Sequence, residues 1–379
     1  MRTPDDNSHS AEHREPPTFM QRAGDEFMAI GREGTFTKAF SKLGMLALKS
    51  VPGGEAVIEL TQVLTNRENS ERQRRLQCYV LGVVQDELYN DTVELLEEDV
   101  IPVIRKLAAD DEAAKTEYYI RLTVALGRIP VSTMSADLRY HFIRLVSMLT
   151  CFQIEFARKL KIRHTVPVCG TASLDEAALA LTAQESGMVM QAVRTLQNAG
   201  LLKERAHDPT WKSAIPFYDT TSDFETLMEL LFYPGDFEPD TVGLTRKELS
   251  DIIIVGAYCF VDNLYTTYLP EALRRKGLNV KIVEKNDRHL TTHWAPLYLH
   301  TVILSDNGRE FIKLYLTREG TSPTTKKAEN YLNCKFESSI YTRDKSRNQG
   351  EAEYFRKEMD RVASCIMMQL EEMKRSHRQ

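Results

Sequence analysis

Residues 251–286 read DIIIVGAYCFVDNLYTTYLPEALRRKGLNVKIVEKN, and this stretch decides the fold class of the C-terminal part of the chain. Residues 252–255 are apolar at every position, which is typical of a short strand buried on both faces of a sheet. A helical segment follows at 261–276 and ends at Gly277, and residues 278–283 form another strand-like run. This order predicts a βαβ unit with two parallel strands and a right-handed crossover.

The residues that follow extend the predicted sheet. Segments 298–304 and 310–316 are strand-like and are joined at Asp306-Asn307-Gly308, which is a strong hairpin signal. Segment 351–374 has the pattern of a long amphipathic helix. We therefore predict an α/β domain at 244–379 that ends in this helix.

A smaller unit is predicted at 166–235. Ser173 and Glu176 form a capping box for a helix at 174–183, and a second helix at 188–198 ends at Gly200. A strand then begins at Leu201, a return strand covers 215–218, and a last helix covers 223–232. Helix, turn, helix and a two-stranded wing, in this order, are typical of a winged helix.

The first part of the chain is predicted to be helical. Residues 1–20 are polar and are expected to form a disordered tail. Residues 21–165 are expected to form a bundle of five or six helices, with a kink at Pro102 and a turn at Pro130. Two apolar stripes at helical spacing indicate the buried faces: Leu76, Tyr79, Val80, Val83 and Val84, then Leu138, Phe142, Leu145, Val146 and Leu149. The predicted fold class is α+β and multi-domain.

Charge and cysteine usage limit the classes of function. A net charge of −5 and a pI near 6.1 argue against a general polyanion binder. No stretch reaches the length of an apolar membrane span, and the acidic residues among the first 17 exclude a signal peptide, so we expect a cytoplasmic protein with no membrane contact. None of the cysteines has the spacing of a metal or redox motif, which indicates a reducing compartment; they are Cys78, Cys151, Cys169, Cys259, Cys334 and Cys365.

The C-terminal domain resembles a known family. The stretch 251–286, together with LYLHTVILSDNGREFIKLYLTREG (297–320) and NCKFESSIYTRD (333–344), is similar to the phospholipase D-like superfamily. That family uses a His-x-Lys-x4-Asp signature for phosphoryl transfer. The resemblance places His300 on the His position, Val302 on the Lys position and Asn307 on the Asp position, with Asp306 one residue away. Two of three roles are vacant, so it implies a degenerate domain that is catalytically silent.

The helical part carries a second resemblance. The segments AKTEYYIRLTVAL (114–126) and LRYHFIRLVSMLT (138–150), followed by the predicted winged helix, resemble the bacterial abortive-infection alpha family. This resemblance implies a bacterial or prophage protein that acts in phage defence.

Three groups of residues are candidates for other sites. The outward face of helix 188–198 carries Gln191, Arg194, Thr195, Gln197 and Asn198, which offer hydrogen bonds to nucleic acid but only one cation; protein docking is the stronger interpretation. His289, His293 and His300 either bind a metal or lie in a solvated loop, and the loop is favoured. The acidic run Glu94, Glu97, Glu98 and Asp99 is interpreted as a solvated helix face.

These patterns lead to three hypotheses about function. The first is a non-enzymatic sensor, regulator or interaction protein with a protein partner or self-association. The second is a phosphodiesterase or nuclease with an unconventional site around His300, which Lys313 on the return strand of the hairpin would assist. The third is a winged-helix regulator that binds DNA. We expect no cofactor and no metal site.

Overall fold

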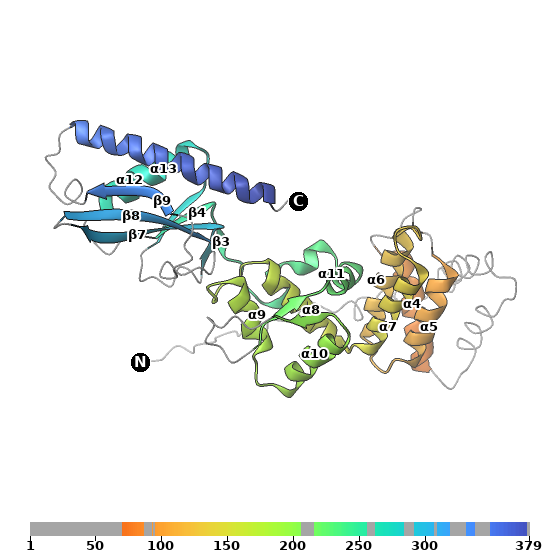
Figure 1. The fold of residues 1–379 in the computed structure, drawn as a ribbon. Coiled ribbons are helices and arrows are strands. Elements are labelled where there is room, and N and C mark those ends of the chain that lie inside the picture. Colours follow the sequence, from red (N-terminus) through yellow and green to blue (C-terminus); the bar gives the residue numbers. More distant parts are fainter. Residues whose placement is uncertain are drawn as a thin grey trace, which may run out of the picture. The chain divides into compact units, whose positions relative to one another are not determined.

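The computed structural model describes residues 70–86, 93, 95–205, 216–255, 262–283, 292–306, 309–318, 331–337 and 349–376. The described part is of mixed α and β character, mainly helical with small sheets, as the sequence predicted (Figure 1). The chain divides into two compact units, Met1–Arg158 with Gly187–Tyr233, and Lys159–Ser186 with Pro234–Gln379. The predicted tail at 1–20 lies outside the described residues, and the division into four parts stays a prediction.

The described part of the first unit starts with consecutive helices. These are α4 (Ser70–Gln85), α5 (Glu97–Ala109), α6 (Lys115–Arg128), α7 (Ala136–Met148) and the first half of α8 (Cys151–Thr165). Pro102 lies inside α5 as predicted, and the N–H of Thr133 donates to the carbonyl of Pro130 in the predicted turn. None of the helices in the described ranges is both long and apolar enough to cross a membrane.

The apolar stripes are largely those predicted, with one correction. Leu76, Tyr79, Val80 and Val83 of α4 are all buried. In α7, however, the expected core residue Leu138 is 38% exposed, whereas Arg139 is buried. The N-cap Ser135 accepts a hydrogen bond from the N–H of Leu138, so Leu138 lies in the first turn of α7. Its inward face consists of Arg139, Phe142, Ile143, Leu145 and Val146.

One acidic residue predicted to face solvent is buried. Asp99 in α5 is 4% exposed, and its Oδ2 lies 2.6 Å from Nη1 of Arg139 in α7. Burial raises the pKa of Asp99, and the nearby Arg139 guanidinium opposes this effect. The interpretation of the acidic run as a solvated face is therefore wrong for Asp99 and correct for Glu98, which is exposed. The side chains of Glu94 and Glu97 lie outside the described residues.

The remaining elements of the first unit match the predicted order. Helix α10 (Gly187–Asn198) ends before Gly200, whose φ of 74° is the left-handed conformation that favours glycine. Strands β1 (Leu202–Glu204) and β2 (Tyr218–Thr220) pair antiparallel, and α11 (Ser222–Leu231) follows. The return strand begins at Tyr218, the last residue of the predicted 215–218, and residue 215 of that range lies outside the described residues. That this arrangement is a winged helix stays a prediction.

The second unit contains α9 and the larger sheet. Ser173 caps α9 (Leu174–Thr182) by accepting from the N–H of Glu176, which confirms the predicted capping residue. Two short 3-10 helices, Pro234–Phe237 and Pro239–Val242, precede the strands. The remaining elements are β3 (Glu248–Leu249), β4 (Ile252–Val255), α12 (Asp262–Arg275), β5 (Val280–Val283), β6 (His293–Trp294), β7 (Leu297–Asp306), β8 (Arg309–Arg318), β9 (Tyr331–Glu337) and α13 (Gln349–Ser376).

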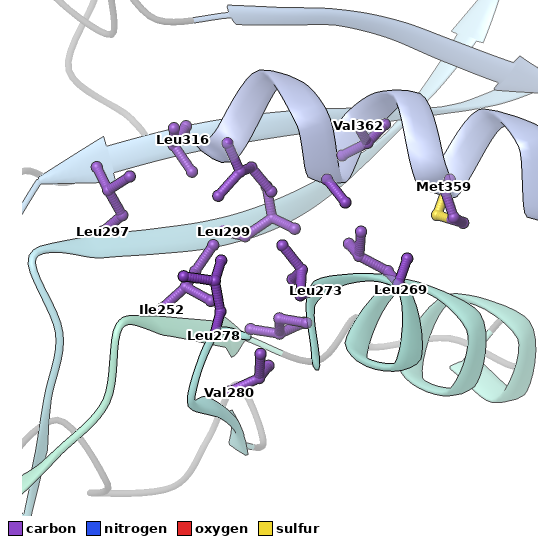
Figure 2. Packing of buried hydrophobic residues seen from close by; sticks show 14 of the residues in the cluster. Ile252, Leu269, Leu273, Leu278, Val280, Leu297, Leu299, Leu316, Met359 and Val362 are labelled. Carbon is purple, nitrogen blue, oxygen red and sulfur yellow. The ribbon is translucent and has the colours of Figure 1, made fainter. Parts of the chain in front are cut away.

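The five-stranded sheet has the order β5-β4-β7-β8-β9. Strand β4 is parallel to β5 and to β7, whereas β7, β8 and β9 are antiparallel, so the predicted parallel pair and hairpin are confirmed. Figure 2 shows side chains from β4, β5, β7 and β8 meeting α12 and α13 in one apolar layer. The other face of the sheet carries a second cluster, made of Ile253, Val255, Val283, Ala295 and Tyr298.

Candidate functional site

His300 lies at a position of the sheet where ligands often bind. Strand β7 is in register with β4 through Ile254 and Leu299, and continuing this register by one residue places His300 beside Val255, the last residue of β4. From β4 the chain crosses to β5 on one side, while β7 flanks β4 on the other. Open α/β sheets bind ligands at the carboxyl ends of strands where the strand order reverses in this way.

The imidazole of His300 is half-buried and is held by a hydroxyl group. Its Nε2 lies 3.0 Å from Oγ1 of Thr317, a buried residue of β8. The Thr317 hydroxyl also lies 3.5 Å from the carbonyl of Tyr298, so it donates a hydrogen bond to that carbonyl when its oxygen accepts a hydrogen bond from Nε2–H of His300. The vacant Asp position therefore does not leave the ring of His300 without a hydrogen-bond partner. A hydroxyl group, however, lacks the negative charge with which a carboxylate stabilises an imidazolium.

The register of the hairpin adds a basic residue to this region. Val302, which holds the position of the family's Lys, pairs directly with Lys313 on β8, and His300 pairs with Tyr315. Directly opposed residues of an antiparallel pair lie on the same face of the sheet. The backbone therefore places Lys313 opposite the vacant Lys position. Asn307 lies outside the described residues, and Asp306 is paired with Arg309 in the register.

The predicted histidine cluster is divided among different environments. His293 is in β6 and is buried, so the interpretation as a solvated loop is wrong for this residue. Its Nε2 lies 2.8 Å from Oε2 of Glu248, and its Nδ1 lies 2.8 Å from Oγ1 of Thr292. His289 lies outside the described residues. Within the described ranges, no group of three or more His, Cys, Asp or Glu side chains is arranged to hold a metal ion.

Sequence reasoning missed the charged residues near His293. The Glu248 carboxylate of β3 contacts both His293 and Lys281 of β5. Nζ of Lys281 lies 3.3 Å from Oε2 of Glu248. The hydrogen bond from Lys281 lowers the pKa of the Glu248 carboxyl, and the charges of Lys281 and His293 act in the same direction. No local motif could have shown this group, because its three members come from three strands.

Helix α10 presents the other predicted site residues. Gln191, Arg194 and Asn198 are exposed and Gln197 is partly exposed, as an outward face requires. Thr195 differs, because its hydroxyl accepts a hydrogen bond of 3.2 Å from the amide of Gln153 in α8. Two residues that the prediction did not single out lie on the exposed surface of α10: Met188 is 57% exposed and Met190 is 50% exposed.

The charges around α10 do not favour a polyanion. Arg194 is the one cation of the helix. Directly after β1, Nε and Nη2 of Arg205 lie 2.8 Å and 2.6 Å from Oδ1 of Asp219 in β2, so this guanidinium is already paired with a carboxylate. The segments 187–205 and 216–233 together contain five acidic and three basic residues. The acidic residues are Glu204, Asp219, Asp223, Glu225 and Glu229, and the basic residues are Arg194, Lys203 and Arg205. A phosphate backbone needs a positive field, which this segment lacks.

Comparison with known proteins assigns no family. No family model matches the chain, and neither a curated protein nor a solved structure matches it. Any role for the α10 face and for His300 therefore rests on their chemistry and on the residues that carry the two resemblances.

Proposed function

We propose that the chain is a non-enzymatic interaction protein, a sensor or regulator, and that the exposed face of α10 binds a protein partner. The observation that supports this proposal is the exposure of Met188 and Met190 beside Gln191 and Arg194. Methionine side chains are flexible and polarisable, and they are enriched in protein–protein interfaces along with arginine. A helix face of this composition suits an apolar protein surface with a polar rim.

The partner is another protein rather than a second copy of this chain. A two-fold contact centred on α10 would bring two cations and no acidic residue of the helix into one interface, because such an interface joins identical patches. Two Arg194 side chains would then repel each other. We therefore propose a partner whose apolar surface carries a carboxylate that pairs with Arg194.

The double substitution Met188→Glu with Met190→Glu should abolish this interaction. We expect the tagged full-length protein to co-purify with one protein at a constant ratio, and the double variant to lose it, because two carboxylates would be buried without partners. Quantitative mass spectrometry and the ratio of absorbance at 260 and 280 nm are the measurements. The matched control is Met368→Glu on α13, where Met368 is 57% exposed; this variant should keep the partner.

Two results would contradict the proposal. Retention of the same partner by the double variant would remove α10 from the interface. Nanomolar binding of duplex DNA at physiological salt, lost in Arg194→Ala, would show a DNA-binding regulator instead. With one cation on the helix, we expect duplex binding to be weak and salt-sensitive at best.

The biological setting that we propose is bacterial phage defence by abortive infection. It rests on the residues of 114–126 and 138–150 together with the helix-turn-helix order that follows them. In this setting the helical part mediates assembly, and the C-terminal domain serves as a binding module.

A phosphodiesterase of the phospholipase D-like type is the second candidate, and one observation favours it. Lys313 stands directly opposite Val302, the position where the family has its phosphate-binding cation. His300 would be the nucleophile and Lys313 the group that holds the phosphoryl oxygens. The partner of His300 is the Thr317 hydroxyl, not a carboxylate, and this is why we favour a silent domain.

Purified protein should show no turnover of a generic phosphodiester or of single- or double-stranded DNA, with or without divalent metal. Loss of one electrostatic contact to the transition state typically lowers the rate by about 10²–10³. Turnover that disappears in both His300→Ala and Lys313→Met, and persists in His141→Ala as a control on α7, would establish the second candidate in place of the first. A His300→Ala protein with unchanged stability and partner binding is the expected result.

A further inference from the structure

Residues 245–250 form the middle strand of a three-segment arrangement within the second unit. On one side lie residues 167–169, which lead into α9, and on the other side lie residues 292–294, which include β6 and lead into β7. An extended strand directs the hydrogen-bonding groups of successive residues to opposite sides. The backbone hydrogen bonds of Thr245, Lys247, Glu248 and Ser250 follow this alternation.

The backbone groups of Thr245 and Lys247 bond toward the segment that precedes α9. The carbonyl of Thr245 accepts a hydrogen bond of 2.8 Å from the N–H of Cys169, and the N–H of Lys247 donates one of 3.0 Å to the carbonyl of Pro167. Val168 and Arg246 form an antiparallel bridge between them. The Lys247 side chain is also buried on this side, where its ammonium lies 3.3 Å from the carbonyl of Ala172.

Even-numbered residues bond toward β6. The N–H of Glu248 donates a hydrogen bond of 3.0 Å to the carbonyl of Thr292, and the N–H of Ser250 donates one of 2.9 Å to the carbonyl of Trp294. The Glu248 side chain strengthens this side through His293 at 2.8 Å and Lys281 at 3.3 Å. These two side-chain contacts add to the backbone hydrogen bonds on this side of the strand.

We propose that residues 245–250 act as a conformational coupling strand between the sheet and the segment that precedes α9. One strand supplies both sets of bonds, so its backbone cannot leave β6 without disturbing its contacts with 167–169. Local opening in folded proteins occurs in contiguous cooperative units, and a shared strand makes its two neighbours one such unit. A change at 292–294, six residues before His300, is thereby transmitted to the residues that position α9.

The experiment is hydrogen exchange on the full-length Glu248→Gln variant, which weakens the side-chain contacts of Glu248 with His293 and Lys281 and leaves the bonds with 167–169 in place. Loss of an exposed ion pair should raise exchange about two- to fivefold in peptides covering 246–251. Coupling predicts a rise by the same factor in peptides covering 166–172, where the Cys169 amide is bonded to Thr245. The matched control is Asp360→Asn, which removes the exposed Arg275–Asp360 pair at 2.8 Å on the same unit. It should leave both regions unchanged.

Two outcomes would overturn the proposal. Faster exchange at 246–251 with unchanged exchange at 166–172 would show that the two sides open independently. Faster exchange at 166–172 with unchanged exchange at 246–251 would show the same independence from the other side. Equal changes in both regions, absent from the control, are the expected result.

Discussion

Replacement of Arg139 by leucine should lower the free energy of unfolding by about 3–5 kcal/mol. The guanidinium is 1% exposed and lies 2.6 Å from Asp99. It also donates to the carbonyls of Leu126 at 3.0 Å, Met134 at 3.1 Å and Ile129, which are the residues that end α6 and form the following turn. The substitution leaves a buried carboxylate and three carbonyls without this donor.

Urea denaturation of matched variants measures this effect. Arg144→Leu on the exposed side of α7 is the control and should change stability by less than about 0.5 kcal/mol. The double variant Asp99→Leu with Arg139→Leu should be more stable than Arg139→Leu alone, because no charge is then left buried without a partner. An Arg139→Leu protein as stable as the control would contradict the role of this ion pair.

The second large effect is expected in the core of the sheet. Leu299 is fully buried between Ile254 of β4 and Leu316 of β8 and faces α12 and α13 (Figure 2). Leu299→Ala should cost about 2–5 kcal/mol, because it removes apolar contacts and leaves a cavity that the layer can only partly close. Denaturation monitored by hydrogen exchange in β4 and α13 is the measurement.

Met368→Ala provides the control for this substitution. Met368 lies on α13, as do the core residues Met359 and Val362, but it is 57% exposed. Its truncation should change stability by less than about 0.5 kcal/mol. A loss below about 1 kcal/mol for Leu299→Ala would mean that this layer is not packed as described.

The features of the fold that could be predicted from the sequence are those set by local signals. The uninterrupted apolar run at 252–255 predicted a strand buried on both faces, and all four residues are buried. Ser173 predicted the start of α9, and Gly277, with a φ of 83°, predicted the end of α12. Each of these signals acts within a few residues, so the sequence states it directly.

The features that could not be predicted depend on residues far apart in the chain. Asp99 and Arg139 are separated by 40 positions, and neither residue's surroundings in the sequence show that both are buried. The same limit applies to Glu248 and Lys281, which are 33 positions apart and come from different strands. The helical period indicated the outward side of α10, and Met188 and Met190 lie three and four residues before Gln191 and Arg194 on that side. Their apolar character, however, is typical of buried residues, so composition argued against their exposure.

The middle strand at 245–250 has a consequence for the protein during its synthesis on the ribosome. Residues 167–172 emerge well before the strand that pairs with them, and chains grow at about 5–20 residues per second, so this delay is roughly 4–15 s. During that time the backbone groups of Pro167 and Cys169 lack the partners that they have in the finished protein, and the side chain of Val168 lacks part of its cover. An unpaired edge of this kind attracts other extended chains. Nascent protein stalled before residue 245 should therefore depend on chaperones and aggregate more readily than protein released after residue 250.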